Sequence, residues 1–268
     1  MRVVFAAARS APGVTTAMLA CASVWPGRVL LVEAAEDGGA LAARFALPVE
    51  PGLTTLTAAS RHGANGAGPA GLLSQHVQVL PGTDRIDALI GPASLEVAQA
   101  LLRTAAGRLA GLLEQAEADV LVDAGRLPAA PLAAPLLASA DRLVLVVRPR
   151  VEELTALAHR LPHLSGLGPA PELLLVGDRP YGPSEVAETL GVPVVGVLAH
   201  DPDAAAALAA VGSPRRLARS PLLRTATGIV DQLVDRRPDP APDGGTEPAR
   251  VNGTAVASRR RRLLAGRS

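Results

Sequence analysis

Lysine is absent from this chain of 268 residues, so all 26 of its basic side chains are arginines. No side chain can therefore act as the lysine that many phosphate sites use, or form a Schiff base with a carbonyl substrate. Arginine also binds phosphate, but with a different reach and a forked geometry. A phosphate site in this protein would have to depend on backbone amides, hydroxyls and arginine.

Cysteine and aromatic residues are also scarce. The single cysteine, Cys21, excludes a disulfide within the chain and a zinc cluster built from cysteines. Aromatic residues make up 1% of the chain and the net charge is +1, so we do not expect a nucleic-acid partner. No apolar run reaches the ~18 residues that a membrane span needs. The N-terminal stretch lacks the pattern of a signal peptide, and we expect a cytoplasmic protein.

Apolar residues are abundant, at 49% of the chain, and they fall into short runs separated by longer helical patterns. Continuous apolar runs are typical of parallel strands that are covered on both faces. The runs predict strands at Val3–Ala7, Arg28–Glu33, His76–Leu80, Asp119–Asp123, Arg142–Val147, Leu173–Val176 and Val194–Leu198. Helices are predicted at Thr15–Ser23, Ser94–Glu117, Val151–Leu161, Ser184–Leu190, Asp203–Val211 and Pro221–Val234. This alternation predicts a three-layer α/β fold with a doubly wound, mostly parallel sheet.

Two segments do not fit this alternation. The Gly- and Ala-rich stretch from His62 to Gly71 predicts a flexible surface loop. Near residue 236 the composition shifts to Pro, Asp, Gly and Arg. We therefore predict a folded domain over residues 1–235 and a disordered Pro/Arg-rich tail over residues 236–268.

The segment after the first strand has the composition of a phosphate-binding loop. It opens a predicted helix, and the amides and dipole at a helix N-terminus attract anions. Gly13 would let the backbone approach a phosphate, and Thr15 and Thr16 offer hydroxyls where P-loops hold Mg²⁺. A turn of small residues between a strand and a helix is also common without any ligand. The loop alone leaves both interpretations open.

The same segment resembles the deviant Walker A motif of MinD/ParA-like P-loop ATPases, K-G-G-x-G-K-[ST]-T. RSAPGVTT aligns with it without gaps, as Arg9, Ser10, Ala11, Pro12, Gly13, Val14, Thr15 and Thr16. Gly13 and both threonines match the motif. Arg9 stands at the signature lysine, which in the family reaches the nucleotide of a dimer partner. Val14 replaces the P-loop lysine, which removes a main part of the machinery for phosphoryl transfer.

Further motifs of the family follow in the same order along the chain. VLLVEAAEDGG resembles the second strand and switch region, with Glu33 at the first aspartate and Ala35 at the second, which orients water in the family. DVLVDAG resembles the Walker B strand, with Asp123 as the carboxylate on the Mg²⁺ side. Asp178 and Asp201 end segments that lie near the nucleotide base in the family.

The resemblance implies a degenerate MinD/ParA-like protein, closest in character to the CpaE/TadZ-like proteins of Flp-type pilus systems. It implies a homodimer that binds ATP and Mg²⁺ weakly, with weak or absent hydrolysis. The implied nucleotide-binding residues are Arg9–Thr16, Asp178 and Asp201, and the implied metal-site residues are Thr15, Asp123 and Glu33. No residue is assigned as catalytic. Simpler roles stay open: Asp123 and Glu33 as polar strand ends, Asp178 and Asp201 as caps, and Arg9 as a solvated loop residue.

Three functions follow from these observations. The first is a nucleotide-binding spatial regulator or assembly factor, with pilus, secretion or partitioning proteins as partners. The second is a scaffold that keeps the fold but binds no nucleotide. The third is an active ATPase for chromosome or plasmid partitioning that uses Arg9 in place of lysine. The basic segment Arg259–Leu264 adds an expected peripheral contact with anionic lipid at the inner face of the membrane.

Overall fold

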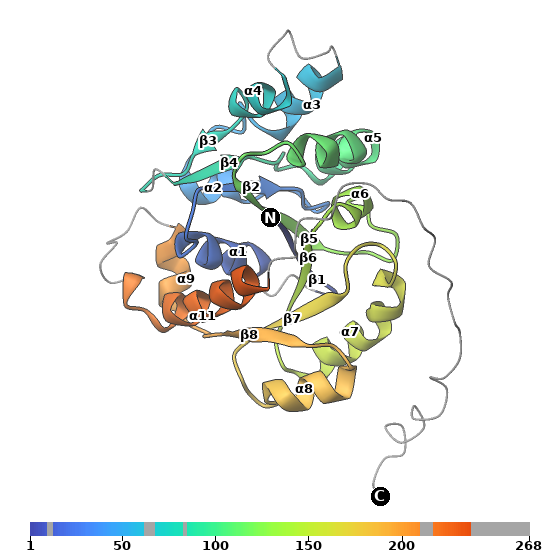
Figure 1. The fold of residues 1–268 in the computed structure, drawn as a ribbon, viewed down its shortest axis with the longest axis vertical. Coiled ribbons are helices and arrows are strands. Elements are labelled where there is room, and N and C mark those ends of the chain that lie inside the picture. The colour runs from blue at the N-terminus through green and yellow to red at the C-terminus, as the bar shows by residue number, and fades with distance from the viewer. Residues whose placement is uncertain (10–12, 62–67, 83–84, 210–216, 237–268) are drawn as a thin grey trace, which may run out of the picture. The chain divides into compact units, whose positions relative to one another are not determined.

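The computed structural model describes residues 1–9, 13–61, 68–82, 85–209 and 217–236, and Figure 1 shows how its elements are arranged. Its strands are β1 (Arg2–Ala7), β2 (Val29–Glu33), β3 (Gln78–Val79), β4 (Ile86–Leu89), β5 (Asp119–Arg126), β6 (Arg142–Val147), β7 (Pro171–Val176) and β8 (Val194–Leu198). The helices are α1 (Val14–Ser23), α2 (Leu41–Phe45), α3 (Leu53–Arg61), α4 (Gly68–Ser74), α5 (Leu95–Leu113), α6 (Ala134–Ala138), α7 (Val151–Leu164), α8 (Pro183–Leu190), α9 (Pro202–Ala209) and α11 (Pro221–Asp235).

The strands form one sheet in the order β3-β4-β2-β5-β1-β6-β7-β8. Every neighbouring pair is parallel except β3 and β4, which are antiparallel at the edge. The chain therefore starts in the middle of the sheet and winds outwards in both directions, as predicted. In such a sheet the crevice for a ligand lies at the carboxyl ends of the strands, where the winding direction changes. Here that point lies beside β1 and β5.

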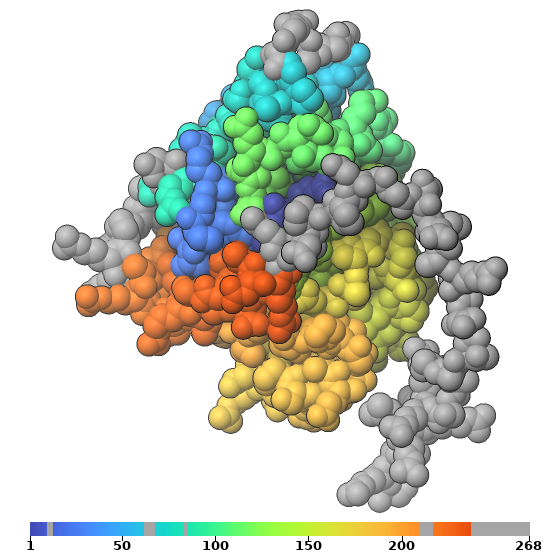
Figure 2. Space-filling model, in the orientation of Figure 1, coloured from blue at the N-terminus to red at the C-terminus, as the bar shows by residue number. Residues whose placement is uncertain are grey.

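Helices cover both faces of the sheet, so its strands are buried on both sides. Side chains of β1 alternate between two apolar clusters: Val3 and Phe5 join the one under α1, α9 and α11, whereas Val4 and Ala6 join the other. The second cluster lies under α3, α4, α5, α6, α7 and α8. Figure 2 shows α11 and α8 on the surface, while only a small dark-blue area of the first residues is visible. This double cover explains why the strand sequences are continuously apolar.

Most predicted elements are present. The differences concern the bounds of elements, the strands next to β2 and several short helices. The segment His76–Leu80 contributes only the two-residue strand Gln78–Val79, and it is antiparallel. The parallel neighbour of β2 is instead Ile86–Leu89, which sequence analysis missed because its four residues include Asp87. Helices α2, α3, α4 and α6, each of nine residues or fewer, were also missed.

The prediction of a flexible loop over His62–Gly71 is wrong at its C-terminal end. Residues 68–71 are the first turn of α4, in which Leu72 and Leu73 are buried against the rest of the second apolar cluster. Tertiary packing of these two leucines outweighs the low helix propensity of the glycines before them. The remainder of that segment, residues 62–67, lies outside the described residues.

Two further predictions concern regions that the structure describes little or not at all. Apart from Arg236, which follows the last turn of α11, the predicted tail over residues 236–268 lies outside the described residues. Within the described part of the chain, no helix has the length and apolar character to cross a membrane.

Candidate functional site

Helix α1 begins at the predicted ligand edge of the sheet, directly after Gly13. Gly13 precedes the helix with φ 90° and ψ 33°, a left-handed conformation that suits glycine. Its carbonyl accepts the first helical bond from the Ala17 amide at 2.8 Å. Gly13 offers no side-chain cap, and the first turn of α1 carries no acidic residue. Among the described residues nothing caps the first amides of α1, so these amides and the helix dipole favour an anion here. Ser10, Ala11 and Pro12 lie outside the described residues.

Thr15 and Asp123 meet at this helix N-terminus, although 108 positions separate them in the sequence. The Thr15 hydroxyl donates to Oδ2 of Asp123 at 2.5 Å. The other carboxylate oxygen of Asp123 accepts the Gly125 amide at 2.8 Å. Parallel pairing of β1 with β5, in which Phe5 lies opposite Asp123, places the carboxylate beside the turn. The two residues that the sequence assigned to one metal site are thus in direct contact.

Burial sets the electrostatics of Asp123, whose exposed fraction is 2%. Loss of water raises the pKa of this carboxyl, while the bonds from Thr15 and Gly125 and the charge of Arg44 oppose the rise. A buried carboxylate with a raised pKa gains from a nearby cation. Hydroxyl and carboxylate oxygens are suitable ligands for Mg²⁺, which keeps several waters and binds through one or two carboxylates and substrate phosphates. The pair therefore fits a magnesium ion carried by a nucleotide.

This candidate metal site does not resemble a site built from protein ligands alone. Among the described residues, no group of three or more His, Cys, Asp or Glu side chains could hold a metal ion. A Mg²⁺ ion at Thr15 and Asp123 would take its remaining ligands from water and phosphate.

Glu33, the third predicted metal-site residue, lies next to Asp123 across the β2–β5 pair but is engaged elsewhere. Its Oε1 accepts the amides of Ala40 at 2.5 Å and Leu41 at 2.8 Å, and its Oε2 accepts the amide of Gly91 at 3.1 Å. Burial raises its pKa, the three amide bonds oppose that rise, and the charge of Asp123 adds to it. Because both oxygens bind backbone, we leave Glu33 out of the proposed metal site. It caps the N-terminus of α2 instead.

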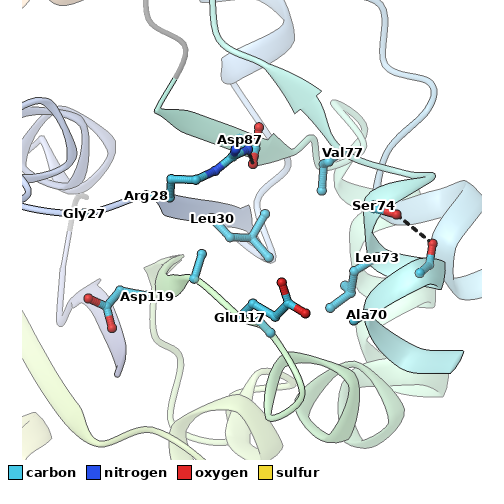
Figure 3. A pocket seen from close by; sticks show the side chains of 13 residues that line it. Gly27, Arg28, Leu30, Ala70, Leu73, Ser74, Val77, Asp87, Glu117 and Asp119 are labelled. Carbon is cyan, nitrogen blue, oxygen red and sulfur yellow. Dashed lines mark hydrogen bonds and ion pairs between the residues drawn. The ribbon is translucent and has the colours of Figure 1, made fainter.

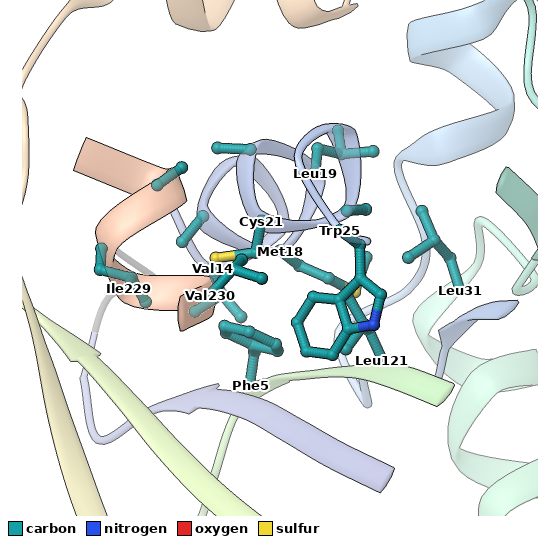
Figure 4. Close-up of a cluster of buried hydrophobic side chains, with 14 of the residues drawn as sticks. Phe5, Val14, Met18, Leu19, Cys21, Trp25, Leu31, Leu121, Ile229 and Val230 are labelled. Atoms are coloured by element: carbon teal, nitrogen blue, oxygen red, sulfur yellow. The ribbon is translucent and has the colours of Figure 1, made fainter. Parts of the chain in front are cut away.

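Val14, at the position of the P-loop lysine, is part of the hydrophobic core. Its exposed fraction is 2%, and it belongs to the apolar cluster between α1 and α11. Figure 4 shows its side chain among Met18, Cys21 and Val230, on the side of α1 that faces Phe5. Successive residues of the first turn thus point in different directions: Val14 into the core and Thr15 towards Asp123.

The neighbours of Ala35 do not replace the missing carboxylate that orients water in the family. Glu36 is 6% exposed, and its carboxylate accepts the Leu132 amide at 2.5 Å. Asp37 pairs with Arg126 at 3.3 Å. Both carboxylates are therefore held by partners of their own.

The remaining predicted residues, Arg9, Asp178 and Asp201, follow the carboxyl ends of β1, β7 and β8. Asp178 follows β7 and is exposed. Asp201 follows β8 and accepts the Ala204 amide at 3.0 Å, so it caps α9. Arg9 is exposed at the end of the β1 segment. These three residues do not contact the Thr15–Asp123 pair in any hydrogen bond or ion pair between described residues.

Sequence analysis missed one charged residue at the site, Arg44. Its Nη1 donates to the Thr16 hydroxyl at 3.3 Å, and its charge lowers the pKa of Asp123. No motif marks it, because it comes from the short helix α2 and reaches the loop only through the fold.

Comparison with solved structures gives an independent view of this architecture. The chain superposes on a ParA family ATPase from Chlorobium tepidum with a TM-score of 0.71 and 18% sequence identity, over 87% of this chain and 97% of that chain. The MinD protein of Pyrococcus horikoshii complexed with Mg-ADP gives a TM-score of 0.66 and 18% identity, over 88% and 97% of the two chains.

The chain has the MinD/ParA fold. A third structure with this fold, the MinC:MinD cell division complex of Aquifex aeolicus, gives a TM-score of 0.64 and 13% identity over 94% of this chain and 99% of that one. No protein-family model matches the sequence, and no curated protein matches it either. The likeness to MinD/ParA structures is therefore one of fold, at identities too low to transfer an activity.

Proposed function

We propose that this chain is a nucleotide-binding protein of MinD/ParA type that acts as a spatial regulator or assembly factor. The observation that carries the proposal is the contact of Thr15 with Asp123 at 2.5 Å, at the open N-terminus of α1. That contact joins the two residues which the sequence motifs assigned to a magnesium site. A solved relative in fold, MinD of Pyrococcus horikoshii, is a complex with Mg-ADP.

The described residues would bind a nucleotide through its phosphates and its metal. The amides at the start of α1 would donate hydrogen bonds to phosphate oxygens, and the Thr15 hydroxyl would turn from Asp123 towards a magnesium ion. Magnesium would supply charge neutralisation between phosphate oxygens and the Asp123 carboxylate. Burial raises the pKa of Asp123, and the positive charge of the metal would favour the ionised carboxylate over the protonated form.

Hydrolysis is proposed to be weak or absent. Phosphoryl transfer depends mainly on positioning and charge stabilisation. Val14 lies in the core and offers neither charge nor donor, while Ala35 has no carboxylate and its acidic neighbours are engaged. The chain would then act as a switch through binding, not through turnover.

Partners and location complete the proposal. We expect a homodimer in which Arg9 of one subunit approaches the nucleotide of the other, and pilus, secretion or partitioning proteins as targets. The segment Arg259–Leu264, outside the described residues, would add contact with anionic lipid at the inner face of the membrane.

A second candidate function is a scaffold of the same fold that binds no nucleotide. One observation favours it: both oxygens of Asp123 already accept hydrogen bonds within the protein, so the carboxyl group has partners without a metal ion. Light scattering separates the two, because the scaffold predicts a dimer whose mass does not respond to ATP. For an active partitioning ATPase that relies on Arg9, no contact among the described residues adds support.

Calorimetric titration of the full chain with Mg-ATP tests the proposed function. We expect binding at micromolar to millimolar nucleotide, and a Thr15→Val variant should lose at least about tenfold in affinity because it lacks the hydroxyl for the metal. Thr104→Val, an exposed threonine on α5, serves as the matched control and should bind like the unmodified chain. Absence of heat at millimolar Mg-ATP would contradict the proposal and leave the scaffold.

A further inference from the structure

We infer that Arg44 supplies the phosphate-binding cation of this site, in place of the lysine that the loop lacks. The inference rests on the proposed function, which it deepens by naming the residue that recognises phosphate. It also differs from the third function considered from the sequence, in which Arg9 takes the place of lysine.

The fold holds α2 in a fixed place, and α2 carries Arg44. Glu33 caps the start of this helix by accepting the amides of Ala40 and Leu41. Directly before the helix, the Gly39 amide donates to the Pro92 carbonyl at 2.8 Å. A side chain at Gly39 would overlap the carboxylate of Glu33, so the loop and the carboxylate are packed without free space. Helix α2, which carries Arg44, is therefore held in place by Glu33 at its start and, through the preceding Gly39, by Pro92.

The guanidinium of Arg44 lies beside the first turn of α1. Its Nη1 donates to Oγ1 of Thr16 at 3.3 Å, and Thr16 is the third residue of α1. It is close enough to Asp123 to lower the pKa of that carboxyl. The charge is thus placed beside the free amides of α1 and beside the proposed metal position, where phosphate oxygens would lie.

Arg44 is also available for an external anion. Within the described ranges its side chain forms no ion pair with a carboxylate, and the one hydrogen bond of its guanidinium goes to a neutral hydroxyl. Its side chain is partly buried, which strengthens a charge-assisted bond relative to one in water. Arg126, at the same edge of the sheet, is paired with Asp37. Arg9 is exposed and would have to be ordered by the ligand.

The test is a calorimetric titration of Mg-ATP into the full chain and into Arg44→Gln and Arg126→Gln variants. Glutamine keeps a donor for Thr16 but removes the charge. We expect Arg44→Gln to lose about 10- to 100-fold in affinity, since it removes a charge-assisted bond to phosphate. Arg126→Gln removes an equal charge from the same edge and should change affinity less than about twofold. Arg44→Lys should retain more affinity than Arg44→Gln.

Two accompanying measurements exclude a purely structural effect. The urea midpoint of Arg44→Gln should match that of the unmodified chain within error, which shows that the variant folds. The Mg-ATP affinity of the unmodified chain should fall with added salt, and this dependence should be shallower in Arg44→Gln because one charge has been removed from the site.

The outcomes separate this inference from the proposed function. If the unmodified chain binds Mg-ATP but Arg44→Gln binds equally well, the function stands and the role of Arg44 is wrong. A loss confined to Arg9→Ala in the same series would assign the cation to Arg9. If the unmodified chain does not bind Mg-ATP or inorganic pyrophosphate, both proposals fail together.

Discussion

Charged side chains are arranged differently at the two edges of the sheet. At the carboxyl edge, Asp123 and Glu33 are buried and bound by hydroxyl and backbone groups, whereas Arg44 has no carboxylate partner among the described residues. At the amino edge, opposite charges pair directly: Arg28 meets Asp87 at 2.8 Å. The first arrangement leaves positive charge and free amides for an external anion. The second pairs Arg28 with Asp87 within the protein.

A cavity of about 800 Å³ lies at the amino edge, where the starts of β2 and β5 face α4. Figure 3 shows Leu30 and Leu73 towards the interior of this cavity, with Arg28 reaching Asp87 at one side and Glu117 pointing inwards. Helices α4 and α5 end here, so their dipoles bring negative potential. Although large, this cavity therefore lies at the edge of the sheet that is less suited to a phosphate ligand.

The largest expected effect comes from placing a charge inside the core at the carboxyl edge. Since Val14 is buried between α1 and α11, Val14→Lys should lower the free energy of unfolding by about 3 kcal/mol or more. Urea denaturation followed by circular dichroism measures this change, with Val14→Ala as the control for lost packing. A Val14→Lys variant of unchanged stability that binds Mg-ATP more tightly would show that position 14 can turn towards the ligand edge.

A smaller change, an increase in the free energy of unfolding, is expected when the buried charge of Asp123 is removed. Because burial raises the pKa of Asp123, the folded state holds its proton more tightly than the unfolded state. The free energy of unfolding then falls as pH rises from the unfolded pKa of about 3.9 through the folded pKa. Asp123→Asn should therefore be more stable at pH 7, by about 1.4 kcal/mol for each unit of the shift.

Asparagine suits this test because it keeps the acceptor for Gly125, while the Thr15 hydroxyl can turn to accept from its amide. Urea midpoints at pH 4 and pH 7 measure the effect, and the decline between them should be reduced in the variant. Part of the decline should remain, since burial also raises the pKa of Glu33. A variant less stable than the unmodified chain at pH 7 would mean that the charged form of Asp123 stabilises the site.

The smallest effect is expected at the amino edge. The side chain of Arg28 is 67% exposed, and exposed ion pairs contribute about 1 kcal/mol or less. Arg28→Gln should thus lower the free energy of unfolding by less than about 1 kcal/mol and leave Mg-ATP binding unchanged. Thermal melting and titration of the same sample check both statements. A tenfold change in nucleotide affinity would show that the two edges are coupled.

Sequence reasoning succeeded where local patterns and the fold agree. The apolar runs identified Arg142–Val147 and Val194–Leu198 with their observed bounds, because buried parallel strands have continuous apolar sequences. The family resemblance predicted one metal site for Thr15 and Asp123; the two side chains are in contact, and the metal site stays a prediction. The fold class followed from the same alternation.

The part that could not be predicted depends on contacts between distant segments. Arg44 reaches Thr16 from α2, whose start is capped by Glu33. The sequence around Arg44 and around Glu33 contains no pattern that indicates either contact. Glu33 matched a motif position, yet three backbone amides determine its role. Val14 was recognised as a lost lysine, but its place in the core required the packing of α11 against α1.

The only tryptophan in the sequence, Trp25, lies just beyond the far end of α1 from the candidate site. It is 3% exposed, and its indole nitrogen donates to Asp119 at 2.9 Å. A helix of ten residues spans about 15 Å, so a ligand at the first turn cannot quench this fluorophore by contact. A change of its emission on adding nucleotide would report an effect transmitted away from the ligand, which makes the native protein its own optical probe of long-range change.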